Sequence, residues 1–192
     1  MQRAGRRSMV LSIFRINLRS RSRVRSSSAN SSSCVARSAG SEKLLARGVP
    51  DDAVVLVHDA ARPCLSPQDL NLLLAASDSC ADSGVILATP VRDTMKRARP
   101  EQSPAQIERT ESREYLWHAL TPQLARLSVL HQALSKGLAD NAQITDEASA
   151  LEYIGLQPRL LEGQASNIKI TRPADLELAE FFLRQRLNEE EG

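Results

Sequence analysis

Residues 54–63 (VVLVHDAARP) constrain the fold of this 192-residue chain more than any other segment. The first four are apolar and three are valine, which predicts a short strand buried on both faces, as in a parallel sheet. Asp59 and Arg62 follow, at the place where open α/β sheets bind ligands. An aspartate there can hold a metal or a ribose hydroxyl, and an arginine can bind phosphate with two donors. An Asp59–Arg62 salt bridge that merely closes the strand fits the same residues equally well.

The charge of the chain changes sign near residue 50. Residues 1–50 contain ten arginines, one lysine and twelve serines against one acid, Glu42, and so carry a net charge of +10. Residues 51–192 contain fourteen basic and twenty-two acidic residues, a net charge of −8. The formal charge of +2 for the whole chain therefore results from a strongly basic part and an acidic part that largely cancel. We expect no nucleic-acid partner, because the basic part has a single aromatic residue, Phe14, and no recognisable binding fold.

Three explanations fit residues 1–48, which form an Arg- and Ser-rich leader ahead of a domain at residues 49–192. Acid-poor termini of this kind are typical of organelle transit peptides, in which case the protein is plastidic. Serine runs bury too little apolar surface to order themselves, so a disordered tail is the second explanation. The third, which we favour, is an out-of-frame translation of a native segment. We expect no membrane association, because the apolar run 9–14 (MVLSIF) is far too short to span a bilayer.

The three cysteines lie far apart without a Cys-x-x-Cys pair, and the three histidines are equally scattered. This spacing argues against a zinc site and against a disulfide framework. A reduced, cytoplasmic protein is therefore the expectation.

Strand and helix patterns alternate from residue 50 onward, which predicts an α/β fold with a Rossmann-like, mostly parallel sheet flanked by helices. After the strand at residue 54, we expect a helix capped by Ser66 and a second buried strand at residues 85–88 (VILA). The core pattern returns at residues 115–117, and a helix is expected directly after Thr121. The remaining expected elements are a helix capped at residues 145–147, an edge strand at 157–161, a short strand at 168–170 and a C-terminal helix from residue 171.

Residues 92–113 break this alternation, because they are polar and charged and contain Pro100 and Pro104. Such a segment cannot belong to the core, and a loop of this length in a compact domain is usually functional or an oligomer contact. We therefore predict a projecting arm at residues 92–115 through which two copies of the chain form a homodimer.

Five motifs carry a family resemblance, and they occur in the order 58–63 (HDAARP), 90–97 (PVRDTMKR), 116–123 (LWHALTPQ), 144–151 (ITDEASAL) and 167–173 (NIKITRP). Together they resemble the 2-C-methyl-D-erythritol 4-phosphate cytidylyltransferase family over about residues 50–187. The resemblance implies transfer of a cytidylyl group from CTP to methylerythritol phosphate, with pyrophosphate as the second product, in non-mevalonate isoprenoid biosynthesis. It also implies Mg2+ as the cofactor and a β-arm that reaches into the partner subunit of a homodimer.

The resemblance assigns roles to single residues. It implies that Asp59 and Lys169 are catalytic, that Asp59 lies near the cytidine ribose and the metal, and that the nucleotide contacts Asp59, Ala60 and Lys169. It implies substrate binding by Arg62, Thr94, Arg113, Thr121 and Thr145. Without the resemblance, Lys169 fits a solvated surface lysine, and the last two threonines fit helix caps. Arg109 lies in the same variable stretch as Arg113 and is the alternative for the role given to Arg113.

The family opens with a strand and a glycine-rich loop, P-A-A-G-x-G-x-R-M, followed by a Pro-Lys pair, and these 192 residues contain no recognisable counterpart. Backbone N–H groups of such a loop cradle a triphosphate. We therefore expect impaired activity, and a strand at residue 54 that lacks a neighbour on one side. Two alternatives remain open, a cytidylyltransferase for another polyol phosphate such as ribitol 5-phosphate, and an inactive fragment that still dimerises through its arm.

Overall fold

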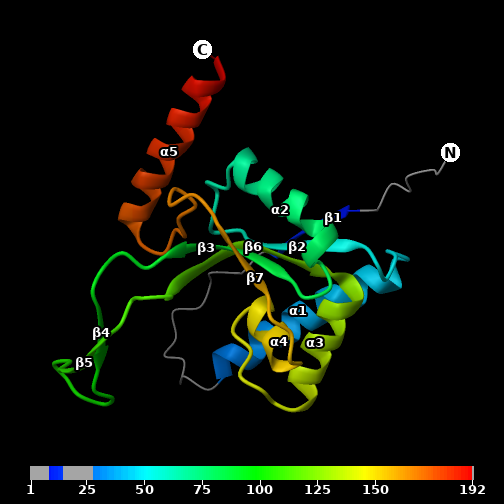
Figure 1. Ribbon diagram of the computed structural model, residues 1–192, viewed down its shortest axis with the longest axis horizontal. Coiled ribbons are helices and arrows are strands. Elements are labelled where there is room, and N and C mark those ends of the chain that lie inside the picture. The colour runs from blue at the N-terminus through cyan, green and yellow to red at the C-terminus, as the bar shows by residue number, and fades with distance from the viewer. Residues whose placement is uncertain (1–8, 15–27, 192) are drawn as a thin grey trace.

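The computed structural model describes residues 9–14 and 28–191 and has a central five-stranded sheet with helices on both faces (Figure 1). Residues 1–8, 15–27 and 192 lie outside the described residues, and so does that part of the expected leader. The strands follow the order β1-β2-β6-β3-β7 across the sheet. Their bounds are β1 Met9–Phe14, β2 Val54–Asp59, β6 Trp117–Arg126, β3 Val85–Pro90 and β7 Arg159–Glu162.

The sheet is mostly parallel in strand direction, as predicted. β1 pairs with β2 in parallel, and β3 pairs with β7 in parallel. β6 lies between β2 and β3 and is antiparallel to both. Only β6 therefore runs against the other four strands, and β7 takes the expected edge position.

β2 is buried on both faces, which confirms the expectation drawn from its valines. Val55 and Val57 pack into one apolar cluster with α3 (Leu127–Ala139) and α4 (Glu147–Tyr153). Val54 and Leu56 pack on the opposite face with residues of α2 (Pro67–Cys80), among them the fully buried Leu73. Because alternate residues of a strand point to opposite faces, a continuous apolar run serves both clusters.

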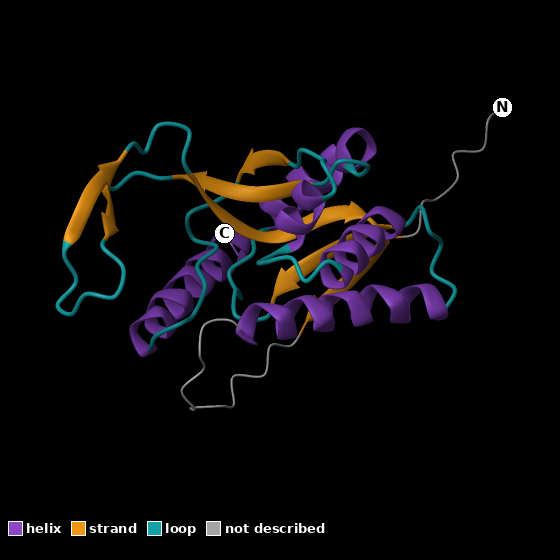
Figure 2. Cartoon of the chain, turned by 90° about the horizontal axis from the view of Figure 1, so that it is seen from below, coloured by secondary structure: helices purple, strands orange, loops and turns teal. Residues whose placement is uncertain are grey.

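Figures 1 and 2 show α2 on one face of the sheet and α1, α3 and α4 on the other. The Ser66 hydroxyl caps α2 by accepting a hydrogen bond from the Asp69 N–H at 3.0 Å. Asp146 caps α4 in a reciprocal capping box with Ser149, and Gly155 follows that helix with a φ of +85°. Both helix starts are therefore confirmed. The C-terminal helix α5 (Pro173–Glu191) begins where the Thr-Arg-Pro sequence predicts.

The prediction of a helix directly after Thr121 is wrong, because residues 117–126 form the long strand β6 and α3 begins only at Leu127. Pro122 is tolerated in this central strand because the pairing between β3 and β6 shifts register between Ile86 and Ala88. The core expected at residues 115–117 is also misplaced. Tyr115 is 89% exposed and Leu116 40%, so the buried part of β6 begins at Leu120.

No strand forms at residues 168–170, contrary to expectation; this segment is an extended part of the loop that joins β7 to α5. One backbone hydrogen bond, from the Ile170 N–H to the Ala61 carbonyl at 2.8 Å, links it to the residues that follow β2. A single such bond is too little for a ladder, because a strand needs repeated pairing with its neighbour.

The boundary expected near residue 48 does not separate the folded part from a leader. Helix α1 (Ser28–Ala46) packs beside α3, and Leu44 and Leu45 contact the cluster around Val55. The expectation that the strand at residue 54 lacks a neighbour is also wrong, because β1 pairs with it along its whole length. The apolar run MVLSIF is that neighbouring strand.

The predicted arm projects from the sheet as a two-stranded hairpin, β4 (Met95–Ala98) and β5 (Ile107–Glu111), in both views (Figures 1 and 2). An ion pair between Arg97 of β4 and Glu111 of β5 links its two strands, and Arg109, also in β5, pairs with the same carboxylate. Among the described residues, no helix is long and apolar enough to cross a membrane.

Candidate functional site

Three charged side chains meet at the carboxyl end of β2, where the sequence places a ligand site. Asp59 is the last residue of that strand, and its carboxylate lies 2.8 Å from the Lys169 ammonium nitrogen. Arg62 is 3.8 Å from the same carboxylate oxygen. The Asp59 side chain is only 14% exposed, whereas Lys169 is 42% exposed. The cluster therefore presents a cation to solvent above a partly buried acid.

Lys169 reaches this cluster from the loop of residues 163–172, and not from a strand as expected. The Arg62 guanidinium donates from Nη1 to the backbone carbonyl of Asn167 at 2.7 Å, and the Asn167 side chain donates to the Thr121 carbonyl at 2.8 Å. The loop is thus fixed to β6 and to the residues after β2. Ala60 lies exposed in the turn that follows Asp59.

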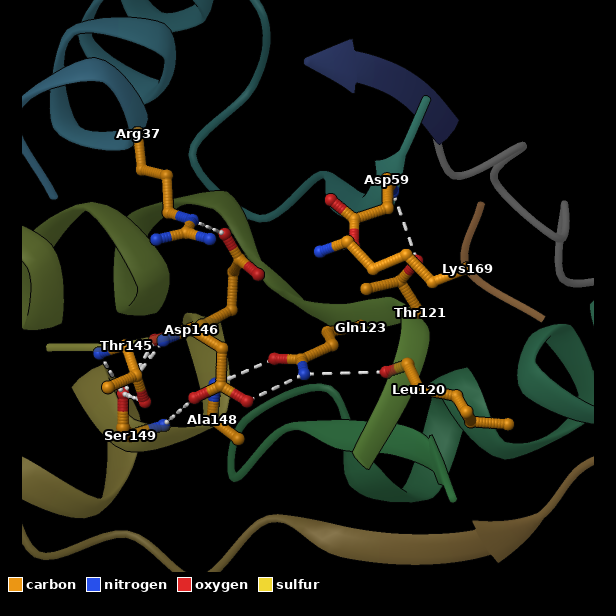
Figure 3. Close-up of polar contacts among 11 residues, drawn as sticks. Arg37, Asp59, Leu120, Thr121, Gln123, Thr145, Asp146, Ala148, Ser149 and Lys169 are labelled. Carbon is orange, nitrogen blue, oxygen red and sulfur yellow. Dashed lines mark hydrogen bonds and ion pairs between the residues drawn. The ribbon is translucent and has the colours of Figure 1, made fainter. Parts of the chain in front are cut away.

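Thr121 joins the cluster through its hydroxyl, which accepts the Asp59 backbone N–H at 3.0 Å (Figure 3). The same oxygen lies 3.0 Å from His58 Nδ1, and His58 Nε2 lies 2.9 Å from the Arg62 carbonyl. A carbonyl can only accept, so Nε2 carries the imidazole proton and Nδ1 accepts from the threonine hydroxyl. This chain of bonds fixes the turn between Asp59 and Arg62.

Burial shifts the pKa of two groups at this turn. Loss of water lowers the pKa of His58, against the opposing influence of the Arg62 carbonyl. Burial likewise lowers the pKa of Arg62, and the negative charge of Asp59 opposes the shift. The lowered pKa favours the neutral form of His58, in which Nδ1 accepts from the Thr121 hydroxyl.

The stability of the fold is expected to fall as the pH drops below about 6.5, the ordinary pKa of histidine, because His58 has a lowered pKa in the folded chain. Below that pH the unfolded chain binds more protons than the folded chain, so acid favours unfolding. Denaturant unfolding from pH 7.5 to pH 5 measures the effect. His58→Gln is expected to show a shallower loss than wild type, and His118→Gln, at an exposed position of β6, is the control. Equal slopes for wild type and His58→Gln would contradict this assignment.

A second polar network ties α4 to β6 beside Thr121 (Figure 3). The buried Gln123 side chain donates to the Asp146 carboxylate at 2.9 Å and accepts the Ala148 N–H at 2.8 Å. Thr145 lies exposed at the start of α4, where its hydroxyl is 3.3 Å from Ser149 Oγ. The network fixes the N-terminus of α4 relative to the strand that carries Thr121, two residues before Gln123.

A buried ion pair connects α1 to the same helix. Arg37 Nε lies 2.6 Å from Glu147 Oε1, and the Glu147 side chain is almost fully buried. Burial raises the pKa of Glu147, an effect that the Arg37 charge opposes. Removing either partner of a buried pair is costly because the other charge then stays in the interior unpaired. Part of the Arg-rich leader thus contributes to the packing behind the site.

The two site residues expected on the arm lie apart from this cluster. Thr94 and Arg113 are both exposed, and Arg113 donates to the backbone carbonyl of Arg92. Within the described residues, no hydrogen bond or ion pair joins either of them to Asp59, Lys169 or Thr121. One chain therefore brings together Asp59, Arg62, Thr121 and Lys169, with Thr145 nearby.

For a metal, the cluster offers one carboxylate, that of Asp59. No group of three or more His, Cys, Asp or Glu side chains with metal-binding geometry occurs among the described residues. Mg2+ is commonly held by one or two carboxylates together with substrate phosphates, so this donor set fits a Mg2+ ion that arrives with a nucleotide.

Sequence reasoning missed three supporting residues, His58, Gln123 and Asn167. Each lies inside a motif that also contains a predicted site residue, and this shared motif is the one sequence feature that could have indicated a role at the site. Their contacts depend on segments far apart in the sequence, such as the 46-residue separation between Asn167 and Thr121. Spacing along the chain therefore could not reveal them.

Comparisons with known proteins point to one family. A profile of that family, described as 2-C-methyl-D-erythritol 4-phosphate cytidylyltransferase, matches residues 37–185. A protein of that name from Escherichia coli O1:K1 / APEC is 57% identical over 136 residues, which are 71% of this chain. The chain spans only 56% of the length of that relative. The profile match begins within α1, earlier than the five motifs indicate.

Solved structures agree with this match. A crystal structure of a 4-diphosphocytidyl-2C-methyl-D-erythritol synthase superposes with a TM-score of 0.69 at 42% identity, covering 78% of this chain and 66% of the other. The 2-C-methyl-D-erythritol 4-phosphate cytidylyltransferase of Francisella tularensis gives a TM-score of 0.63 at 38% identity, over 69% of this chain and 60% of that one. Both share the α/β arrangement described above.

Proposed function

Because this chain belongs to the 2-C-methyl-D-erythritol 4-phosphate cytidylyltransferase family, we propose that its site serves cytidylyl transfer from CTP to methylerythritol phosphate. The products are 4-diphosphocytidyl-2-C-methyl-D-erythritol and pyrophosphate, in isoprenoid precursor biosynthesis. One observation carries the proposal, the cluster of Asp59, Lys169 and Arg62 at the carboxyl end of β2, with 2.8 Å between the first two side chains. Two cations beside one acid suit the binding of phosphates.

In this reaction a phosphate oxygen of methylerythritol phosphate attacks the α-phosphorus of CTP, and the bond to pyrophosphate breaks. Negative charge spreads over the α-phosphate oxygens in the transition state, so catalysis rests on positioning and on fixed positive charge. Lys169 supplies such a charge, and it is exposed enough to meet a ligand. Its pairing with Asp59 holds the ammonium in place before the substrates bind.

Asp59 would face the cytidine ribose and hold the cofactor. Mg2+, bound by this carboxylate and the phosphates, would supply charge neutralisation at the transferring group. Ala60 has a methyl side chain and lies exposed in the next turn, so a nucleotide can approach the backbone there. The support for this arrangement is the carboxylate at the strand end, where open α/β sheets bind their ligands.

Arg62, Thr121 and Thr145 are proposed to contact the substrates from this chain. Arg62 is aligned by the Asn167 carbonyl, and Thr121 by Asp59 and His58. Thr145 lies exposed just before α4, so its side chain can face a ligand. Each of these three positions is fixed by contacts within the chain, which favours preorganised binding.

Thr94 and Arg113 are proposed to reach the methylerythritol phosphate bound to the partner subunit of a homodimer. Their exposure on the arm, away from the cluster of their own chain, supports a role across an interface. Large apolar side chains on the arm and at its base also lie exposed, namely Ile107, Tyr115 and Leu116. Exposed apolar patches of this kind mark protein interfaces.

The arm, residues 92–115, is expected to hold the homodimer together. Replacing residues 95–111 by a short Gly-Ser linker should halve the mass measured by light scattering, because it removes both strands of the hairpin together with the exposed Ile107. Tyr115→Asp should weaken the dimer as well. Leu138→Asp, at an exposed leucine of α3, is the matched control and should leave the mass unchanged. A monomeric wild-type chain, or an unchanged mass after the deletion, would contradict this assignment.

We also propose a cytoplasmic location with reduced thiols. Cys64 and Cys80 are both buried and free, which suits a reducing compartment.

The proposed substrate is tested with a panel of acceptors. A chain supplied with the family's nucleotide loop should form the CDP-alcohol from methylerythritol phosphate in preference to ribitol 5-phosphate, with mass spectrometry as the readout. Preference for ribitol 5-phosphate would overturn the choice of substrate. Failure to transfer to either acceptor, with CTP bound, would overturn the proposed activity.

A further inference from the structure

We propose that Asn167 is a positioning residue that holds Lys169 at the site by tying its loop to β6. The proposal rests on the proposed function, because Lys169 matters there as the cation that meets phosphate. Asn167 is 1% exposed, so it cannot itself contact a ligand from the surface. Any effect of Asn167 on binding must therefore pass through the residues that it holds.

Two contacts of Asn167 span the site. Its side-chain Nδ2 donates to the Thr121 carbonyl at 2.8 Å, which attaches the loop to β6. Its backbone carbonyl accepts from Arg62 Nη1 at 2.7 Å, which attaches the loop to the turn after β2. Lys169 follows two residues later and reaches Asp59 at 2.8 Å. Asn167 thus connects the three segments that supply Arg62, Thr121 and Lys169.

The loop needs this tie because it has no strand to fix it. Lys169 lies between the Asn167 side chain and the Ile170 N–H, which donates to the Ala61 carbonyl at 2.8 Å. Of these two flanking bonds, only the one made by Asn167 depends on a side chain. Without it the segment keeps its backbone bonds, but the attachment to β6 is lost.

The orientation of the Asn167 amide follows from its partner. The Thr121 carbonyl can only accept, so Nδ2 must face it. The other amide atom, Oδ1, is buried without a hydrogen-bond partner among the described residues. Asn167→Asp therefore keeps the shape of the side chain but places a carboxylate oxygen, an acceptor, opposite the Thr121 carbonyl, which is also an acceptor. Asn167→Ala removes the side-chain hydrogen bond altogether.

Hydrogen exchange tests the tie without any ligand. The Ile170 amide should exchange at least about tenfold faster in Asn167→Ala and in Asn167→Asp, because the side-chain hydrogen bond that attaches its loop to β6 is gone. The Leu56 amide in β2 should keep its wild-type rate. Asn71→Asp makes the same chemical change at an exposed position of α2 and should alter neither rate. Unchanged exchange of Ile170 in both Asn167 variants would overturn the proposal.

A double-mutant cycle separates positioning from general destabilisation. In a chain that carries the family's nucleotide loop, Asn167→Asp should weaken CTP binding about tenfold, and by a clearly smaller factor when Lys169→Met is also present. The same factor in both backgrounds would mean that Asn167 does not act through Lys169, and would overturn the proposal. If that chain bound no CTP, the proposed function would fail, and the exchange of Ile170 would decide the role of Asn167.

Discussion

A polypeptide with this 192-residue sequence is expected to release pyrophosphate from CTP and methylerythritol phosphate at well below about 1 s⁻¹, the low end of typical enzyme turnover. The triphosphate of CTP carries about four negative charges near neutral pH. Against these, the described site offers Lys169, already paired with Asp59, and Arg62, whose guanidinium is engaged by the Asn167 carbonyl. Too little fixed positive charge remains for the triphosphate.

The family's glycine-rich loop would add several backbone donors and further cations. Each charge-assisted contact contributes roughly 1.5 to 3 kcal/mol, so losing three or four of them costs at least ~5 kcal/mol, more than about a thousandfold in affinity or rate. A CTP titration by calorimetry and a pyrophosphate-release assay measure the two effects. Turnover at about 1 s⁻¹ or faster would show that another part of the chain replaces that loop.

Asp59→Ala and Lys169→Ala are each expected to lower kcat/KM by about a hundredfold or more, in a chain that carries the nucleotide loop. This loss corresponds to at least ~2.7 kcal/mol of transition-state stabilisation. The physical reason is that the ammonium meets charge that develops in the transition state, while the carboxylate aligns that ammonium at 2.8 Å and faces the ribose. Steady-state kinetics with both substrates varied separates the effect on kcat from that on KM.

The chain contains a matched control for these substitutions. Lys136 of α3 and Asp140, the residue that follows this helix, form a lysine–aspartate pair with the same 2.8 Å separation, but both side chains are exposed. Exposed pairs contribute little to stability, so Lys136→Ala and Asp140→Ala should leave kcat/KM within about twofold of wild type. A loss below about tenfold for Asp59→Ala or Lys169→Ala, at normal stability, would remove that residue from the proposed machinery.

Elements whose pattern is local were predicted well from the sequence. The valine run of β2 and the VILA run of β3 are buried as their composition indicates, since a strand covered on both faces needs apolar residues at every position. The Thr-Asp-Glu start of α4 likewise contains its own cap. The polar stretch after Pro90 became an arm because it has too few apolar residues to join the core.

Elements decided by tertiary contacts were predicted poorly. A Thr-Pro pair is typical of a helix start, yet Thr121 and Pro122 lie in the central strand β6. The neighbouring strands β2 and β3 pair with β6 on its two sides and bury its Leu124. The Ser-rich sequence of α1 has only a weak amphipathic pattern. The helix is held in position by packing against α3 and by the ion pair of Arg37 with Glu147 of α4. Neither partner is adjacent in sequence.

The proximity of Asp59 and Lys169 could be predicted only through the family resemblance. The two residues are 110 positions apart, which gives no spacing rule, and the lysine alone fits an exposed surface position. The proximity of Arg62 and Thr121 could not be predicted from spacing either, because the turn after β2 and the middle of β6 come together only in the folded sheet. The supporting contacts of His58 and Asn167 needed the structure.

The most direct test of the central claim, that residues 37–185 supply one half of a cytidylyltransferase site, is pyrophosphate release by a chimaera. Residues 37–192 of this chain would be joined to an N-terminal segment that carries the opening strand and glycine-rich loop of the family. We expect turnover of about 1 s⁻¹ or more with CTP, methylerythritol phosphate and Mg2+, and its loss in the chimaera carrying Lys169→Met. A folded, dimeric chimaera that binds CTP but releases no pyrophosphate would contradict the claim.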